Sequence, residues 1–237
     1  MPAGRTTLDC APRWGSTATS TRAPTSSSSA AETRSARQEC EMARIIAGTH
    51  KGRRLVAVPT DATRPTSDRV KESLFSRLEG YDALHDAVVV DLYAGSGALG
   101  FESLSRGARS LEAVDKAEAA VRTLRRNAEF FGAEASPALR REVSVHKADA
   151  LRYLGSRSGP PIELLFLDPP YSLGDAELFK VLSAAREQLH EAATVVIERD
   201  AGSGAPSLPE GLEIFSEKSY GSTQIFMVEP SPAALPH

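Results

Sequence analysis

The chain has 237 residues, of which 41% are apolar and 25% charged, values typical of a soluble globular protein with a large buried core. No apolar run approaches the length that spans a membrane, which argues against an integral membrane protein. The formal net charge of -3 excludes a uniformly basic nucleic-acid binder, so any such contact must be confined to one part of the surface.

Residues 1–41 contain the run Ser26–Ser29, scattered Thr, Ala and Pro, and no periodic apolar pattern, which predicts a disordered extension. No apolar signal core is present and acidic residues argue against a transit peptide, so we expect a cytoplasmic protein. We expect translation to start at Met42, with the upstream stretch a misassigned start. Both cysteines, Cys10 and Cys40, lie in this stretch, so the rest of the chain has neither disulfides nor thiolate metal ligands.

Residues 42–80 are predicted to form a small basic β-hairpin and a helix. Two short extended runs flank Gly48–Gly52, and Thr66, Ser67 or Asp68 can cap a helix with an apolar side. Basic residues outnumber acidic ones here, which suggests a local RNA-binding surface; the alternative is an ordinary solvated face. The predicted RNA-binding residues are Arg44, Lys51, Arg53, Arg54, Arg64 and Arg69.

A strand, a glycine turn and a helix follow. Val88–Val90 leads into Asp91–Gly100, where the glycines fit the spacing G-x-G-x-x-G, and Asp115 ends a second strand where an acid that binds ribose is expected. The same pattern is typical of nicotinamide and flavin enzymes, so an enzyme of that class is one candidate. Asp91 disfavours it, because a carboxylate near the turn repels a pyrophosphate. The ammonium and sulfonium of S-adenosylmethionine suit such a site better.

A third strand, Val143–His146, brings Asp149 to the same edge, where it can accept from an adenine amine. Between these strands, an apolar stripe predicts a helix that Gly132 ends. The glycine loop, the acid expected to bind ribose (Asp115) and the acid expected to bind adenine (Asp149) therefore lie at the ends of three successive strands. The predicted cofactor-binding residues are Asp91, Tyr93, Ala94, Gly95, Ser96, Gly97, Asp115, Lys116, Asp149 and Ala150.

The buried run Leu164–Leu167 ends at Asp168, Pro169, Pro170 and Tyr171. Two prolines stiffen the turn and cannot donate backbone hydrogen bonds. A carboxylate, a fixed carbonyl and an aromatic ring suit a planar NH2 group, which needs two acceptors and a stacking surface. The plainer interpretation is a Pro-Pro turn with a capping Asp.

Further on, an apolar stripe from Leu178 to Leu189 predicts a helix, Thr194–Glu198 a strand, and Leu212–Ser216 with Gln224–Glu229 a closing strand pair. This alternation predicts a largely parallel sheet with helices on both faces. We place the catalytic domain at 81–230 and a tail at 231–237. The five histidines show no zinc spacing, so we expect no metal.

Taken together, the motifs resemble the RsmD family of bacterial small-subunit (16S) ribosomal RNA guanine-N2 methyltransferases, from about Met42 to Glu229. The strings that carry the resemblance are Arg44–Gly48, Lys51–Arg53, Arg64–Phe75, Asp91–Gly100 and Asp168–Tyr171, of which Arg64–Phe75 is the most specific. The resemblance implies a Rossmann-like class I methyltransferase fold with a mostly parallel seven-stranded sheet and an antiparallel last strand. It further implies S-adenosylmethionine as methyl donor, catalysis by Asp168, Pro169, Pro170 and Tyr171, and ribosomal RNA or an assembly intermediate as partner.

We expect the protein to be a monomer, and three other functions stay open. The chain could be another amino methyltransferase, acting on adenine N6 in DNA or RNA or on a protein glutamine, since the Asp168–Tyr171 turn serves any planar amine. It could be a nicotinamide oxidoreductase, which Asp91 disfavours. It could also be a noncatalytic RNA-binding assembly factor, which the intact Asp168–Tyr171 turn argues against.

Overall fold

A computed structural model describes residues 43–59, 68–132 and 142–231. The extension 1–41, Arg64 and almost all of the tail lie outside the described residues. No described helix is both long and apolar enough to cross a membrane.

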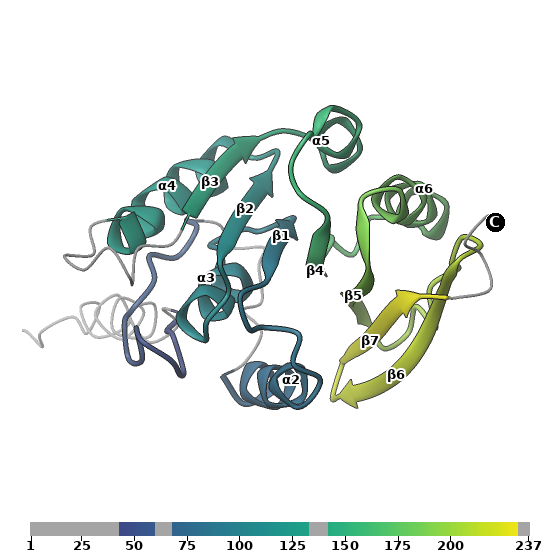
Figure 1. The fold of residues 1–237 in the computed structure, drawn as a ribbon, viewed down its shortest axis with the longest axis horizontal. Coiled ribbons are helices and arrows are strands. Elements are labelled where there is room, and N and C mark those ends of the chain that lie inside the picture. Colours follow the sequence, from purple (N-terminus) through teal and green to yellow (C-terminus); the bar gives the residue numbers. More distant parts are fainter. Residues whose placement is uncertain (1–42, 60–67, 133–141, 232–237) are drawn as a thin grey trace, which may run out of the picture. The chain divides into compact units, whose positions relative to one another are not determined.

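Seven strands form one sheet in the order β3-β2-β1-β4-β5-β7-β6 (Figure 1). The first five run parallel, and β7 lies antiparallel to both of its neighbours. The strands are β1 (Val88–Leu92), β2 (Ser110–Asp115), β3 (Glu142–Lys147), β4 (Ile162–Leu167), β5 (Leu189–Asp200), β6 (Leu212–Tyr220) and β7 (Thr223–Pro230). The expected seven-stranded sheet with an antiparallel last strand is confirmed.

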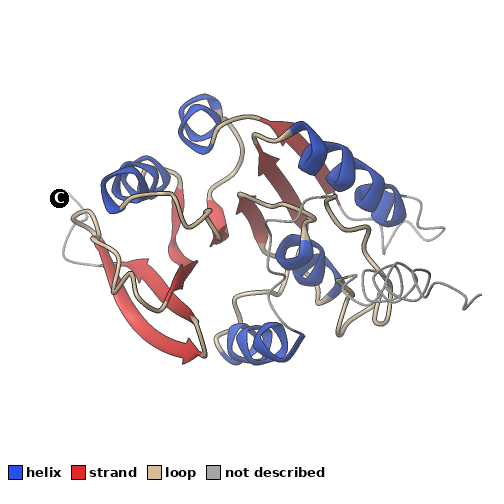
Figure 2. Cartoon of the chain, turned by 180° about the vertical axis from the view of Figure 1, so that it is seen from behind, coloured by secondary structure: helices blue, strands red, loops and turns tan. Residues whose placement is uncertain are grey.

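Helices cover both faces of the sheet (Figures 1 and 2). They are α2 (Asp68–Gly80), α3 (Ala98–Ser105), α4 (Glu118–Gly132), α5 (Ala150–Ser156) and α6 (Asp175–Arg186). The first three pack on one core and the last two on the other. Val89 joins the first core and Val90 the second, because successive side chains of a strand point to opposite faces. The central strands β1 and β4 are therefore apolar almost throughout.

The expected hairpin is present in a short form. Arg44 and Arg54 make a single antiparallel bridge, and Ile45 N and Leu55 N donate to backbone carbonyls of the opposite run. Ile45 and Leu55 are fully buried in the first core. The segment is therefore held by these two anchors more than by strand pairing.

One local expectation was wrong, and one helix was missed. The helix α6 ends at Arg186, and Leu189 starts β5, because the chain turns to pair Gln188 and Leu189 with Ile162. Asp91 lies in β1, one residue before the strand ends, so its carboxylate is near the turn, as expected. The helix α5 had not been expected, because its seven residues are too few to show a clear period.

Candidate active site

Parallel pairing brings the predicted residues to one edge of the sheet. Leu92 pairs with Val114 on one side and with Leu167 on the other, so the loop after β1 lies between the ends of β2 and β4. Asp115 ends β2, and Asp168 directly follows β4. The carboxyl edge of an open α/β sheet is where ligands bind, and the glycine loop and the Asp168–Tyr171 turn meet there.

The glycine loop contains three residues with positive φ: Tyr93 (67°), Gly95 (56°) and Gly97 (81°). A Cβ at Gly97 would lie 2.8 Å from a methyl carbon of Leu124 and closer still to the ring of Phe101, so packing requires glycine there. A Cβ at Gly95 would meet nothing within 4 Å. The backbone of Gly95 is therefore open to a ligand, and the strain at Tyr93 marks a candidate functional site.

The carboxylate of Asp91 is almost fully buried beneath this loop, at 2% exposure, and accepts a hydrogen bond from Gly100 N at 3.1 Å. Burial raises the pKa of Asp91 to about 7, helped by the charge of Asp115 and opposed by the Gly100 bond. A buried acid of this kind favours a cationic ligand over an anionic one.

Asp115 supports the glycine loop from the next strand. Its Oδ2 accepts from Gly95 N at 3.0 Å and its Oδ1 accepts from Ala117 N at 2.8 Å. A carboxylate has about four lone-pair sites, so each oxygen can accept a further hydroxyl hydrogen. The expected ribose contact is compatible with this geometry and stays a prediction, as does a role for the exposed Lys116.

Asp149 caps α5: its Oδ1 accepts from Leu151 N at 3.0 Å and from Arg152 N at 3.4 Å. Burial raises the pKa of Tyr93 to about 12, and the charges of the nearby Asp149 and Glu177 add to this effect. Asp149 therefore has a structural role as a helix cap. Its predicted adenine contact would use the same carboxylate, next to the buried Ala150.

The Asp168–Tyr171 turn opens to solvent. Pro170 O accepts from Leu173 N at 2.8 Å, so this carbonyl closes the turn. Tyr171 is 71% exposed, which leaves its ring open for stacking. Asp168 is exposed as a residue. Desolvation of its carboxyl group, together with the charges of Glu198 and Asp91, raises the pKa of Asp168 well above its usual value.

Glu198 was not predicted as a site residue. Leu167 pairs with Ile197, so Glu198 stands next to Asp168 on the neighbouring strand, where strands are about 4.8 Å apart. The sequence held a signal for it, because Glu198 ends the expected strand Thr194–Glu198 in the same way that Asp168 follows its own.

The described basic residues predicted to bind RNA lie on the hairpin and at the start of α2. Lys51, Arg53 and Arg54 are exposed, and Arg53 lies over the ring of Phe130 at 4.3 Å. Arg44 Nε pairs with Asp68 at 2.8 Å, which offsets part of its charge. Arg44, Asp68 and Arg69, with further residues of α2, line a hollow of about 610 Å³.

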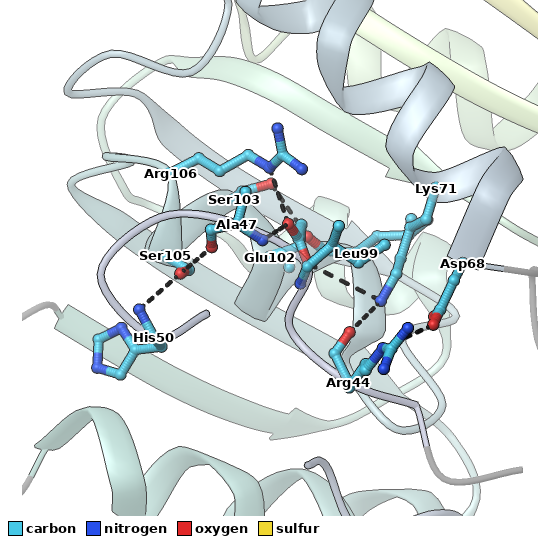
Figure 3. A network of polar contacts seen from close by, with 12 residues as sticks. Arg44, Ala47, His50, Asp68, Lys71, Leu99, Glu102, Ser103, Ser105 and Arg106 are labelled. Atoms are coloured by element: carbon cyan, nitrogen blue, oxygen red, sulfur yellow. Dashed lines mark hydrogen bonds and ion pairs between the residues drawn. The ribbon is translucent and has the colours of Figure 1, made fainter. Parts of the chain in front are cut away.

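A buried polar network fastens the hairpin to the sheet domain (Figure 3). Glu102, which has no exposed surface, accepts from Ile46 N at 2.7 Å, Ala47 N at 3.0 Å and Arg106 Nε at 2.8 Å. Lys71 Nζ donates to Arg44 O at 2.5 Å and lies 3.8 Å from Glu102. Burial lowers the pKa of Lys71, while Glu102 and Asp68 act in the opposite direction. Neither Glu102 nor Lys71 was predicted as a site residue from the sequence.

Comparison with solved structures agrees with this architecture. An Escherichia coli protein described as a methyltransferase, yhhF, has a TM-score of 0.67 and 29% identity, covering 80% of this chain and 98% of that one. Magnesium protoporphyrin IX methyltransferase from Synechocystis PCC 6803, solved with bound SAM, shares the fold alone, with a TM-score of 0.53 and 14% identity over 69% of this chain and 79% of that one. The chain has the Rossmann-like class I methyltransferase fold.

A family model described as Conserved hypothetical protein 95 matches residues 43–229. Ribosomal RNA small subunit methyltransferase D of Escherichia coli strain K12 is 32% identical over 178 residues, which cover 75% of this chain and 85% of that protein. The chain belongs to this family, the RsmD family, as its motifs had indicated.

Proposed function

We propose that this protein transfers a methyl group from S-adenosylmethionine to the exocyclic N2 amine of a guanine in small-subunit (16S) ribosomal RNA, during ribosome biogenesis. The observation that carries the proposal is the Asp168–Tyr171 turn beside the glycine loop at one sheet edge. Similarity to a protein named Ribosomal RNA small subunit methyltransferase D supports the choice of RNA.

The residues around the glycine loop fit this cofactor. S-adenosylmethionine has no phosphate and carries an ammonium and a sulfonium, which suit the buried carboxylate of Asp91. The open backbone at Gly95 leaves room for a ligand to approach, and Asp115 and Asp149 offer acceptors for ribose hydroxyls and an adenine amine. When bound, the cofactor supplies an electrophilic methyl group on a positively charged sulfur.

Asp168 is the proposed catalytic residue. A guanine amine is a poor nucleophile because its lone pair is delocalised into the ring, so acceptors that bind its hydrogens favour a pyramidal nitrogen. Asp168 and the Pro169 carbonyl provide them, and Tyr171 stacks on the base. Once the new C–N bond has formed, the nitrogen must lose a proton, and a carboxylate with a raised pKa is a suitable acceptor.

The basic segment within 42–80 is proposed to bind RNA, and 81–230 to catalyse the transfer. Because a stacked, paired guanine cannot reach such a turn, the target base must be unpaired or flipped. Lys51, Arg53 and Arg54 are exposed and suited to phosphates, which position an RNA without reading its sequence.

Mass spectrometry of nucleosides tests this proposal. Unmodified small-subunit RNA and assembled subunits are each incubated with the protein and S-adenosylmethionine, with Asp168→Asn as the matched inactive control. We expect N2-methylguanosine with the wild type alone. N6-methyladenosine in its place, or no methylated nucleoside although cofactor binding is measured, would refute the proposed acceptor.

A further inference from the structure

Asn127 is a buried amide that joins two segments far apart in the sequence. It has no exposed surface. Its Oδ1 accepts from Val56 N at 2.9 Å, and its Nδ2 donates to Val56 O at 3.1 Å and to Ser96 O at 2.9 Å. The side chain therefore holds both backbone groups of Val56 and, with the same nitrogen, a carbonyl of the glycine loop.

The two partners belong to the two proposed binding regions. Ser96 directly follows Gly95, where the loop is open to a ligand. Val56 belongs to residues 43–59, here called the docking segment, which carries exposed basic residues. The side-chain amide of Asn127, on α4, connects the backbone of Val56 directly to the backbone of the loop.

The rest of the docking segment is fixed by other contacts. Glu102 holds Ile46 N and Ala47 N, and Ser105 Oγ donates to Ala47 O at 2.6 Å and accepts from His50 N at 2.9 Å (Figure 3). These anchors lie in the first half of the segment, and the buried Leu55 holds the residue before Val56. Val56 itself is bound to the Asn127 amide, so a displacement of Val56 changes the orientation of this amide, and with it the hold on Ser96.

Asn127 also occupies a position where an apolar residue would be expected. It lies three residues after Leu124 and four before Phe131, both fully buried on the inner stripe of α4. A buried amide adds little net stability compared with an apolar side chain that fits the same space, but its hydrogen bonds fix the geometry of its partners.

We propose that Asn127 is a positioning residue that couples the docking segment to the glycine loop, so that RNA and cofactor strengthen each other's binding. RNA bound to the docking segment restrains Val56, and the amide passes this restraint to Ser96 and the loop that holds the cofactor. Because coupling between two sites is reciprocal, the cofactor strengthens RNA binding by the same factor. The identity of the first ligand as RNA rests on the proposed function.

The test uses Asn127→Asp, which keeps the shape and the acceptor for Val56 N but removes the donors to Val56 O and Ser96 O. Asn127→Leu removes these donors and also the acceptor for Val56 N, but it adds no buried acid, and it serves if the first variant does not fold. Thr123→Val, a change at another buried polar residue one turn earlier on α4, is the matched control. S-adenosylhomocysteine is titrated by calorimetry with and without unmodified small-subunit RNA, and thermal midpoints are recorded.

In the wild type and in Thr123→Val, we expect RNA to tighten S-adenosylhomocysteine binding at least about fivefold. In the Asn127 variants, we expect binding without RNA to weaken by about tenfold and the effect of RNA to fall to a factor of about one. An Asn127 variant that keeps the wild-type coupling would overturn the proposal, as would an equal loss in Thr123→Val. The proposal would also be overturned if the wild type methylates RNA but RNA has no effect on its affinity for S-adenosylhomocysteine. Coupling without N2-methylguanosine would instead refute the proposed function and leave this inference intact.

Discussion

Replacing Asp91 by asparagine should stabilise the protein at alkaline pH while it damages the cofactor site. The folded state raises the pKa of Asp91 from 3.8 to about 7, mainly through burial. Between these two pH values the folded protein keeps a proton that the unfolded chain has lost, so the free energy of unfolding falls as the pH rises. Above pH 7 the buried, ionised Asp91 lowers the free energy of unfolding by about 4 kcal/mol as an upper estimate. Below pH 4 this loss of stability vanishes, because Asp91 is protonated in both the folded and the unfolded state.

Asparagine cannot ionise, and its oxygen can still accept from Gly100 N. The free energy of unfolding of Asp91→Asn relative to the wild type should therefore rise between pH 4 and pH 8, by up to about 4 kcal/mol. Urea denaturation followed by circular dichroism at several pH values measures this. An unchanged difference between variant and wild type across that range would refute the raised pKa.

The same carboxylate predicts the pH dependence of cofactor binding in the wild type. Since the cationic cofactor favours the ionised acid, affinity for S-adenosylmethionine should increase as the pH rises through about 7. Asp91→Asn should bind the cofactor at least about tenfold more weakly at pH 8 and show a flat profile. A variant that retained the wild-type profile would assign the titration to another group.

Three further changes test the site and its support. Asp168→Ala should lower kcat at least about 100-fold with cofactor affinity nearly intact, because it removes the proposed acceptor; equal kcat in a methyl-transfer assay would reject that role. Gly97→Ala should lower the thermal midpoint far more than Gly52→Ala, since both have positive φ but only position 97 lacks space for a Cβ; equal losses in calorimetry would contradict the packing argument. Lys71→Met should destabilise the fold by about 3 kcal/mol, because it leaves the carbonyl of Arg44 without its buried donor and removes a cation beside Glu102; urea denaturation showing no loss of stability would contradict this role.

The order of the elements could be predicted from the sequence because it depends on local patterns. Apolar runs such as Val88–Val90 and Leu164–Leu167 mark buried strands whichever neighbours they acquire. In a parallel sheet, the residues that follow each strand collect at one edge, so the sequence alone predicts that the glycine loop, Asp115 and Asp168 lie together. The family resemblance rested on the same local strings and is confirmed by the family match.

The features decided by tertiary structure depend on groups distant in the chain. Leu189 continues the apolar stripe of α6, but pairing with Ile162 places it in β5. Neither the depth of Asp91 in β1 nor the charges near Asp168 can be read from neighbouring residues. The hydrogen bonds of Asn127 to Val56 and Ser96 could not be predicted from its place on the inner stripe of α4. Sequence periodicity determines which face of an element is buried, whereas the partner of a buried polar group follows only from how the elements pack.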